Sequence, residues 1–270
     1  MIEKKINSLC IWFFENLSQY EGIGHFVSTR TGGHSSRPFD ALNLSFNVGD
    51  DPKKVLKNRE LLTAAIETPL TSLTTAKQIH DGHVTIVSDG LRGKGSTDYK
   101  GAINATDAMV TNVAGISLMI LLADCVPILF YDPSKRVIGV AHAGWKGILR
   151  FVAQNTVEAL REHFHCSPQD IIVGIGPSIG PCCYEVGQEV VSDVERIFGT
   201  RQACISKESV NGKRYFDLWT ANLRQILQTG IPERNIEMAE ICTCHNPHLF
   251  FSYRYEKGKT GRFGAGIVIR

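Results

Sequence analysis

The stretch GISLMILLADCVPILFYDPSKRVIGVAHAGWKG, residues 115–147, decides the fold of this chain. It contains two apolar runs, Gly115 to Ala123 and Val137 to Ala141, which are rich in Ile, Leu and Val and too short for helices. Runs of this length and composition predict buried strands. The apolar character resumes after Asp124 and lasts to Tyr131, so the tract predicts two strands about Asp124-Cys125. A membrane-spanning helix would need about 20 uninterrupted apolar residues.

Metal-competent side chains stand where these apolar runs end. Cys125 follows the first run and His142 follows the second, while His80 ends a short strand-like stretch that begins at Ala76. Two His and one Cys, with no fourth ligand, have the composition of an open zinc site, which leaves one coordination position for water or substrate. The pattern therefore points to catalysis.

Helix signals flank the central strands. Asp50 and Asp51 are candidate N-caps before Pro52, which predicts a helix through about Ile66. After His142, Gly144 and Gly147 allow a tight turn into a second helix, along which apolar residues from Val152 to Phe164 recur at helical spacing. Further helices are expected at 187–198 and 218–227, and further strands at 170–175, 236–242 and 264–269.

These elements alternate irregularly, and the connections between the central strands are too short for parallel crossovers. The pattern favours an α+β fold with mixed β-sheets flanked by helices over a doubly wound fold. Neither an internal repeat nor a low-complexity linker is present. We therefore expect a single domain over residues 1–270.

Composition excludes several classes of function. The 29 Lys and Arg nearly balance the 27 Asp and Glu, and no long basic run occurs, so nothing favours nucleic-acid binding. The apolar stretch Leu9 to Phe14 follows two lysines but lacks a small-residue cleavage site, so we expect neither secretion nor a membrane partner. The spacing of the eight cysteines resembles no small secreted scaffold, which favours a reducing cytoplasm. Oligomeric state is not encoded in any of these patterns.

The chain resembles the YfiH/LACC1-type family, which is labelled multicopper polyphenol oxidoreductase laccase and is understood as a family of zinc-dependent purine nucleoside enzymes. The resemblance runs from about Phe26 to the C-terminus. It is carried, in the family's order, by Ser28–Gly33, Asn43–Ser45, Gln78–His80, Ala123–Pro127, Ala141–Trp145, Gly176–Ile179 and Phe250–Arg254.

This resemblance implies a layered CNF1/YfiH-like fold and a zinc centre held by His80, Cys125 and His142. It also implies two reactions. One is phosphorolysis of adenosine, inosine or S-methyl-5'-thioadenosine to a base and a pentose 1-phosphate, and the other is deamination of adenosine to inosine. The expected partners are purine nucleosides and phosphate, and the expected cofactor is zinc, with copper possible because copper also binds His and Cys.

Cationic and amide side chains in the matching segments are candidates for substrate binding. Arg30 combines a bidentate donor with neighbouring glycines that could expose backbone N–H groups to phosphate. Arg254 and Lys77 are further candidate phosphate ligands, and Asn43 could hydrogen-bond ribose or phosphate.

Asp124 directly precedes the proposed thiolate and is a candidate catalytic residue together with Cys125. It could orient a ligand imidazole, transfer a proton beside the metal, or simply form the turn. Glu185 is a second candidate for the general acid or base, which the sequence leaves unassigned.

Three other functions fit parts of the pattern. Cys125 and His142 could be the nucleophile and base of a cysteine hydrolase or deamidase. A copper-dependent polyphenol oxidase would suit the old family label, but the chain lacks the paired His-x-His motifs that several copper centres require. A metal-binding module without turnover is the third, and the open coordination position argues against it.

The tail carries a possible second metal site. Four metal-competent residues occur within seven positions, namely Cys242, Cys244, His245 and His248. The alternative is that the two cysteines are simply buried in the scaffold. Cys182 and Cys183 are adjacent, and we expect them to be poorly placed to share one ion and to serve packing instead.

Overall fold

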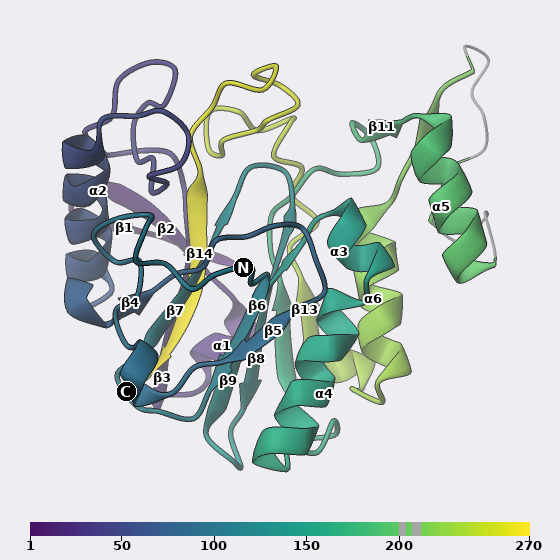
Figure 1. The fold of residues 1–270 in the computed structure, drawn as a ribbon, viewed down its shortest axis with the longest axis horizontal. Coiled ribbons are helices and arrows are strands. Elements are labelled where there is room, and N and C mark those ends of the chain that lie inside the picture. The colour runs from purple at the N-terminus through teal and green to yellow at the C-terminus, as the bar shows by residue number, and fades with distance from the viewer. Residues whose placement is uncertain (200–203, 207–211) are drawn as a thin grey trace.

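Two six-stranded sheets stacked face to face form the centre of the protein, and helices cover their outer faces (Figure 1). The computed structural model describes residues 1–199, 204–206 and 212–270. Helix α2 (Pro52–Ala65) covers one sheet, while α4 (Val152–Phe164) and α6 (Leu218–Gln228) cover the other. The arrangement confirms the predicted mixed α+β fold with layered sheets.

The first sheet joins the N-terminal hairpin to the last strand of the chain. Its strand order is β1-β2-β3-β14-β7-β4, with antiparallel neighbours except for the parallel pair β4 and β7. The strands are β1 (Ile2–Ile6), β2 (Leu9–Phe13), β3 (Ile23–Ser28), β4 (Leu73–Thr74), β7 (Ser117–Leu122) and β14 (Phe263–Ile269).

The second sheet contains the strands that frame the candidate ligands. Its order is β13-β10-β8-β9-β6-β5, with parallel pairs at both edges and antiparallel pairs between them. The strands are β5 (Val84–Ile86), β6 (Ala108–Thr111), β8 (Val126–Asp132), β9 (Val137–Ala143), β10 (Ile172–Ile175) and β13 (Ile236–Met238). As the short connections predicted, β8 and β9 are antiparallel neighbours.

The apolar runs at the centre are continuous because both faces of each strand are buried. In β9, Ile138 and Val140 enter the core between the two sheets, whereas Val137 and Ala141 enter the core beneath α4 and α6. β7 divides its side chains in the same way between the central core and the core beneath α2. Strands buried on both sides need apolar residues at every position, which explains the absence of a polar alternation in the sequence.

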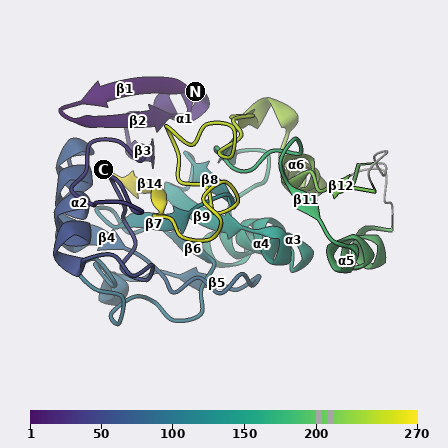
Figure 2. The same ribbon diagram turned by 90° about the horizontal axis from the view of Figure 1, so that it is seen from above.

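Smaller elements complete the fold. Short helices α1 (Glu15–Ser18) and α3 (Trp145–Leu149) lie against the second sheet and its covering helices. Strands β11 (Glu185–Val186) and β12 (Arg214–Tyr215) pair with each other, and α5 (Gln188–Phe198) lies beyond α6 at the far end of the molecule (Figure 2). Among the described residues, short 3₁₀ turns occur at Leu70–Ser72, Asp89–Leu91 and Glu233–Asn235.

Most predicted elements occur within a few residues of their expected bounds, with three differences. The stretch before His80 is a loop, because β4 ends at Thr74 and only Ala76 makes a further bridge. The strand expected at 236–242 is shorter and ends at Met238, as β13. The helix after His142 is divided into α3 and α4, because Phe151 adopts a left-handed conformation between them.

A membrane span is not found among the helices of the described residues, because none of them is both long and apolar enough. The N-terminal apolar stretch instead forms β2, whose Leu9 and Ile11 are buried in the core beneath α2.

Candidate functional site

The three predicted ligands converge on one point. One donor atom each from His80, Cys125 and His142 lies within 4.8 Å of the other two, and the two imidazole rings meet edge to face at 4.8 Å between centroids. His142 is almost fully buried, Cys125 is half-buried and His80 is exposed. A thiolate with two imidazoles is a borderline-soft donor set that suits zinc, so the residues present fit the expected metal.

Strand register brings Cys125 and His142 together. Val126 pairs with Ala143 across β8 and β9, so Cys125 lies beside Gly144 at the end of the ladder. A Cβ atom on Gly144 would come within 2.9 Å of the Cys125 sulfur and 3.0 Å of the His80 ring. Glycine is therefore required here for steric reasons, since any side chain would occupy the space where the ligands meet.

His80 reaches the site from a loop that two polar side chains hold in place. Gln78 forms a pair of hydrogen bonds with the backbone of Leu121, each 2.9 Å long. The carboxylate of Asp107 accepts backbone N–H groups of Ile79, His80 and Asp81 at 3.1, 3.0 and 2.8 Å. These bonds replace strand pairing, which is why a segment that resembles a strand in sequence forms a loop.

Asp107 also orients the buried imidazole, a role that the sequence analysis missed. Its carboxylate accepts a hydrogen bond from Nδ1 of His142 at 2.8 Å, which leaves Nε2 free to bind a metal. Although burial alone raises the pKa of the Asp107 carboxyl, the hydrogen bonds from His142 and the backbone lower it below its usual value. The only sequence signal is an acidic residue directly before the buried strand β6.

Cys125 and His142 stabilise each other's charged form. Burial alone raises the pKa of the Cys125 thiol, but the charge and hydrogen bonds of His142 and His80 outweigh it and lower this pKa to about 6. Burial alone lowers the pKa of His142, but Cys125 and Asp107 outweigh it and raise this pKa to about 9. Without a metal, the pair is therefore a thiolate and an imidazolium at neutral pH.

Asp124 connects the site to the C-terminal tail. Its carboxylate accepts a hydrogen bond from the Thr243 hydroxyl at 2.6 Å and another from the backbone N–H of Arg254 at 2.7 Å. Burial dominates its environment and raises the pKa of this carboxyl. Asp107, rather than Asp124, contacts the ligand imidazole of His142. A catalytic role for Asp124 stays a prediction.

A pocket of about 570 Å³ opens beside the three ligands. This volume lies in the range of small-molecule sites. The walls combine apolar, aromatic and polar side chains, and their residues come from both sheets and from the tail. Beside the three ligands and Asp124, they include Ser45, Asn47, Gln78, Tyr99, Trp145, Ile179, Tyr184, Tyr253, Arg254 and Arg262.

Two arginines line this pocket. Arg254, predicted from the sequence, stacks on Tyr184 and donates to the carbonyl oxygens of Cys183 and Glu185 at 3.2 and 2.9 Å. Arg262, which the sequence analysis missed, lies over Tyr253 and donates to two carbonyls of its own loop. Burial lowers the pKa of Arg262, although nearby Cys125 opposes this effect. Its only sequence signal is a Gly-Arg pair before the last strand.

Arg30 lies outside the lining of this pocket. Its guanidinium donates to the carbonyls of Asp40 and Pro247, each at 2.8 Å, and pairs with Glu256 at 3.0 Å. The side chain is 11% exposed and stacks on Phe251. A second pocket borders Arg30. Arg30 therefore borders a different pocket from the one beside the three candidate ligands, and phosphate binding by Arg30 stays a prediction.

Asn43 and Lys77 are also absent from the pocket lining. Asn43 is fully buried, and its amide bonds Asp50 and the backbone of Ser45 and Arg262. Lys77 bonds Asn104 at 2.8 Å and lies over Tyr99, which does line the pocket. Asn43 is therefore held by other parts of the chain, and Tyr99 is the pocket residue nearest in contact with Lys77. Substrate binding by these two residues stays a prediction. Glu185 is likewise outside the lining and pairs with Lys213.

A second cluster of metal-competent side chains lies near the pocket wall. Cys242 and His245 from the tail meet Cys182 and Cys183, and one donor atom from each lies within 4.8 Å of all the others. The expectation that adjacent Cys182 and Cys183 are poorly placed to share an ion is therefore wrong. Cys244 and His248, the other tail candidates, are not members of this cluster.

Sequence comparisons extend over nearly the whole chain. The family described as multi-copper polyphenol oxidoreductase laccase matches residues 24–270. The purine nucleoside phosphorylase YlmD of Geobacillus stearothermophilus is 38% identical over 256 residues, which cover 95% of this chain and 93% of the relative. The adenosine deaminase RL5, from an unknown prokaryotic organism, is 30% identical and covers 92% of this chain and 94% of its own.

The fold is shared with solved structures. The crystal structure of the Bacillus licheniformis protein YfiH superposes with a TM-score of 0.92 at 32% sequence identity, and the match covers 98% of each chain.

Proposed function

The chain belongs to the family described as multi-copper polyphenol oxidoreductase laccase, and on this premise we propose that it is a zinc-dependent enzyme of purine nucleosides. This membership confirms the resemblance seen in the sequence. The proposed reactions are phosphorolysis of adenosine, inosine and S-methyl-5'-thioadenosine, and deamination of adenosine to inosine. The observation that carries the proposal is the convergence of His80, Cys125 and His142 at the wall of a nucleoside-sized pocket.

His80, Cys125 and His142 would hold the zinc, and the protein prepares each of them. Asp107 accepts a hydrogen bond from Nδ1 of His142 and orients its ring, Gly144 leaves room for the donors, and the two imidazoles lower the pKa of the Cys125 thiol. Zinc bound there would supply Lewis-acid chemistry, which activates water for attack on C6 of adenine. Tyr99, Trp145 and Tyr184 provide aromatic surface for a purine ring.

Phosphorolysis also requires a binding site for phosphate. Arg254 and Arg262 are the two cationic side chains among the residues that line the pocket within the described part of the chain. Guanidinium groups form strong charge-assisted hydrogen bonds to phosphate oxygens. We therefore assign phosphate binding to these arginines rather than to Arg30. Copper remains the alternative metal, because the donor set would accept it as well.

One specific observation favours a second candidate function. The lowered pKa of Cys125 beside an imidazolium is also the arrangement of a nucleophilic cysteine in hydrolases. In that case Cys125 would attack a carbonyl carbon and His142 would protonate the leaving group. The two candidates differ in their need for metal.

Product analysis by mass spectrometry tests the proposal. Purified protein is incubated with adenosine, with and without phosphate, and before and after removal of metal by a chelator. We expect adenine and ribose 1-phosphate only with phosphate, inosine under both conditions, and neither reaction in metal-free protein until zinc is restored. Full activity of the metal-free protein would contradict zinc catalysis.

A further inference from the structure

Two segments build the second cluster, and they follow two neighbouring strands of the second sheet at the same end of that sheet. β10 and β13 are parallel neighbours, so their carboxyl ends emerge side by side. The chain beyond β10 forms the loop that carries Cys182 and Cys183, and the chain beyond β13 carries Cys242 and His245. An isolated bridge between Ser178 and Cys242 continues the pairing past the strands. The sheet thus fixes the relative position of both segments.

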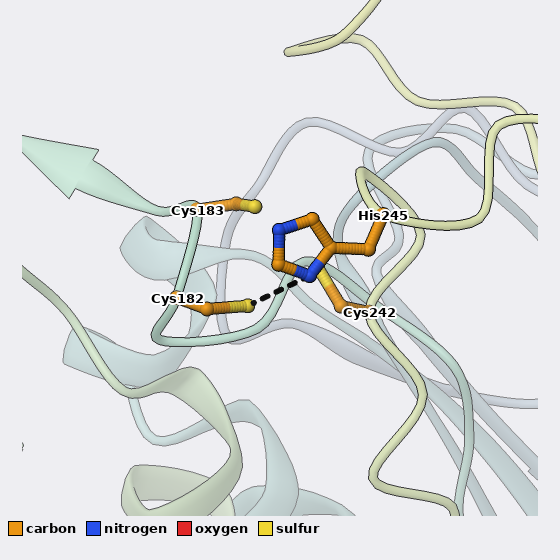
Figure 3. Close-up of side chains that lie close together, drawn as sticks. All are labelled: Cys182, Cys183, Cys242 and His245. Carbon is orange, nitrogen blue, oxygen red and sulfur yellow. Dashed lines mark hydrogen bonds between the residues drawn. The ribbon is translucent and has the colours of Figure 1, made fainter.

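Tight turns direct the side chains inward (Figure 3). The N–H groups of Cys183 and Tyr184 both bond the carbonyl of Gly180 at 3.0 Å, which turns the loop so that Cys182 and Cys183 face the same space. In the tail, the Asn246 N–H bonds the Cys242 carbonyl at 3.1 Å. This turn brings His245 over the sulfur of Cys242, three residues before it in the sequence.

Distances within the cluster are close to those of a coordinated ion. The Cys182 sulfur lies 3.5 Å from Nδ1 of His245, and the four donor atoms are all within 4.8 Å of one another. Zinc–sulfur bonds of about 2.3 Å in a tetrahedral site place the sulfurs about 3.8 Å apart. A contraction of about 1 Å at most would therefore complete the coordination.

The Cys242 sulfur has a backbone donor that suits a thiolate. The backbone N–H of Gly180 points at the Cys242 sulfur at 3.2 Å. A donor so placed stabilises negative charge on the sulfur and orients it toward the other ligands. Gly180 has no room for a side chain, since a Cβ atom would lie 3.2 Å from the Cys182 sulfur and 2.9 Å from Trp219.

We propose that Cys182, Cys183, Cys242 and His245 form a second, structural zinc site. Three thiolates and one imidazole are soft donors that select zinc over magnesium or calcium. Four protein ligands fill a tetrahedral shell and leave no position for substrate, which is the property of a structural site. The assignment depends only on these four residues and holds whether or not the proposed enzymatic function is correct.

Such an ion would cross-link two parts of the pocket wall. The loop contributes Ile179 and Tyr184 to the pocket, and the tail contributes Tyr253 and Arg254. The Arg254 guanidinium already donates to the carbonyl of Cys183, one of the four ligands. Zinc at the cluster would hold the loop and the tail at a fixed separation and so position the Arg254 side chain.

The metal content of the full-length protein tests the site. The protein is purified with a phosphine reductant, and its zinc is measured by inductively coupled plasma mass spectrometry. Cys182→Ala and His245→Ala should each lose one zinc per chain relative to the unmodified protein. Both residues are exposed, so neither change should disturb the core. His248→Ala is the matched control from the same tail and should lose none, because His248 lies outside the cluster. Equal zinc content in all four proteins would overturn the proposal, as would equal losses in the two test variants and the control.

Cobalt substitution identifies the ligands directly. Thiolate-to-cobalt charge-transfer absorption grows with the number of cysteine ligands, so the proposed three-thiolate site should dominate the spectrum. Cys182→Ala should remove about a third of the absorption of the three-thiolate site if cobalt stays bound, and all of it if cobalt is lost. Cys125→Ala should leave the absorption of this site in place. A mass two units lower than expected, which indicates a disulfide within the cluster of the freshly purified protein, would contradict the proposal.

Discussion

The two side-chain clusters use similar donors in opposite settings. His80, Cys125 and His142 offer three donors at the wall of a pocket, and a buried carboxylate bonds one imidazole. Cys182, Cys183, Cys242 and His245 offer four donors between a loop and the tail, and a backbone N–H rather than a carboxylate bonds one sulfur.

On the proposed assignments, this difference separates a reactive site from a structural one. Donor number decides whether a coordination position stays open, and the neighbouring cavity decides whether substrate can reach it. The carboxylate of Asp107 would make His142 a stronger ligand and fix its orientation. The second cluster, within the part of the chain that the structure describes, instead joins a loop to the tail.

The largest expected effect comes from removing one sulfur from each cluster. Cys125→Ala should lower both phosphorolysis and deamination by more than about 100-fold, because loss of a ligand exceeds the 10–100-fold cost of losing a ligand's hydrogen-bond partner. Cys182→Ala should change kcat by no more than a few-fold. Rates of both reactions are measured on protein of known zinc content. Similar losses in the two variants would remove the distinction between the clusters.

Replacing the carboxylate behind His142 should have the next largest effect. Asp107→Asn should lower zinc affinity and activity by about 10–100-fold. Both oxygens of Asp107 accept hydrogen bonds from N–H groups, and the NH₂ group of an asparagine would face some of these donors instead of accepting from them. Zinc affinity is measured by competition with a chromophoric chelator. Asp81→Asn is the control, because Asp81 is the adjacent carboxylate of the His80 loop and pairs with Arg150 on the surface. If both variants bind zinc normally, Asp107 does not assist the ligand.

Arg254 lines the pocket beside the first cluster and contacts Cys183 of the second. Its substitution should weaken phosphate binding without affecting deamination. Arg254→Gln should raise the KM for phosphate by about tenfold, the lower end for a lost charge-assisted hydrogen bond, and should spare deamination. Arg30→Gln should leave this KM unchanged and lower Tm, because the largely buried Arg30 side chain pairs with the half-buried Glu256. Steady-state kinetics with varied phosphate decide the point. A raised KM in Arg30→Gln alone would move phosphate to the second pocket.

The smallest effect is a difference in thiol reactivity after metal removal. The pKa of Cys125 is about 6, so its alkylation should rise as pH increases through 6 and level off above about 7. Burial raises the pKa of Cys183, so this thiol should stay unreactive throughout that range. Peptide mapping after brief iodoacetamide treatment measures both. Alkylation of Cys125 that begins only near pH 8.5 would indicate that His142 does not stabilise its thiolate.

The sequence predicted the parts of the site that lie on or beside the central strands. Cys125 and His142 are recognisable because apolar runs end at them. Asp107 and Arg262 were missed because their roles depend on contacts distant in the sequence, such as the bond from His142 to Asp107. Arg30 occurs in a glycine-rich motif that suggests phosphate binding, but only the structure reveals that Asp40, Pro247 and Glu256 occupy its donors.

The grouping of cysteines from the loop and the tail could not be predicted from the sequence either. Adjacency of Cys182 and Cys183 suggests divergent side chains, and only the turn at Gly180 brings both sulfurs to the tail. The single domain, the cytoplasmic location and the identity of the metal stay predictions, because no contact within the chain bears on them.

Both faces of β9 are buried, which restricts the places where substrate specificity can change. A shift of β9 by one residue would exchange the side chains of two cores, so His142 cannot move relative to Cys125 without unfolding both. Tyr99, Tyr184, Tyr253 and Arg254, by contrast, belong to loops and the tail. Mutation can therefore remodel the walls that select a nucleoside while the reacting centre stays fixed, which makes this scaffold a suitable starting point for laboratory evolution of new base specificity.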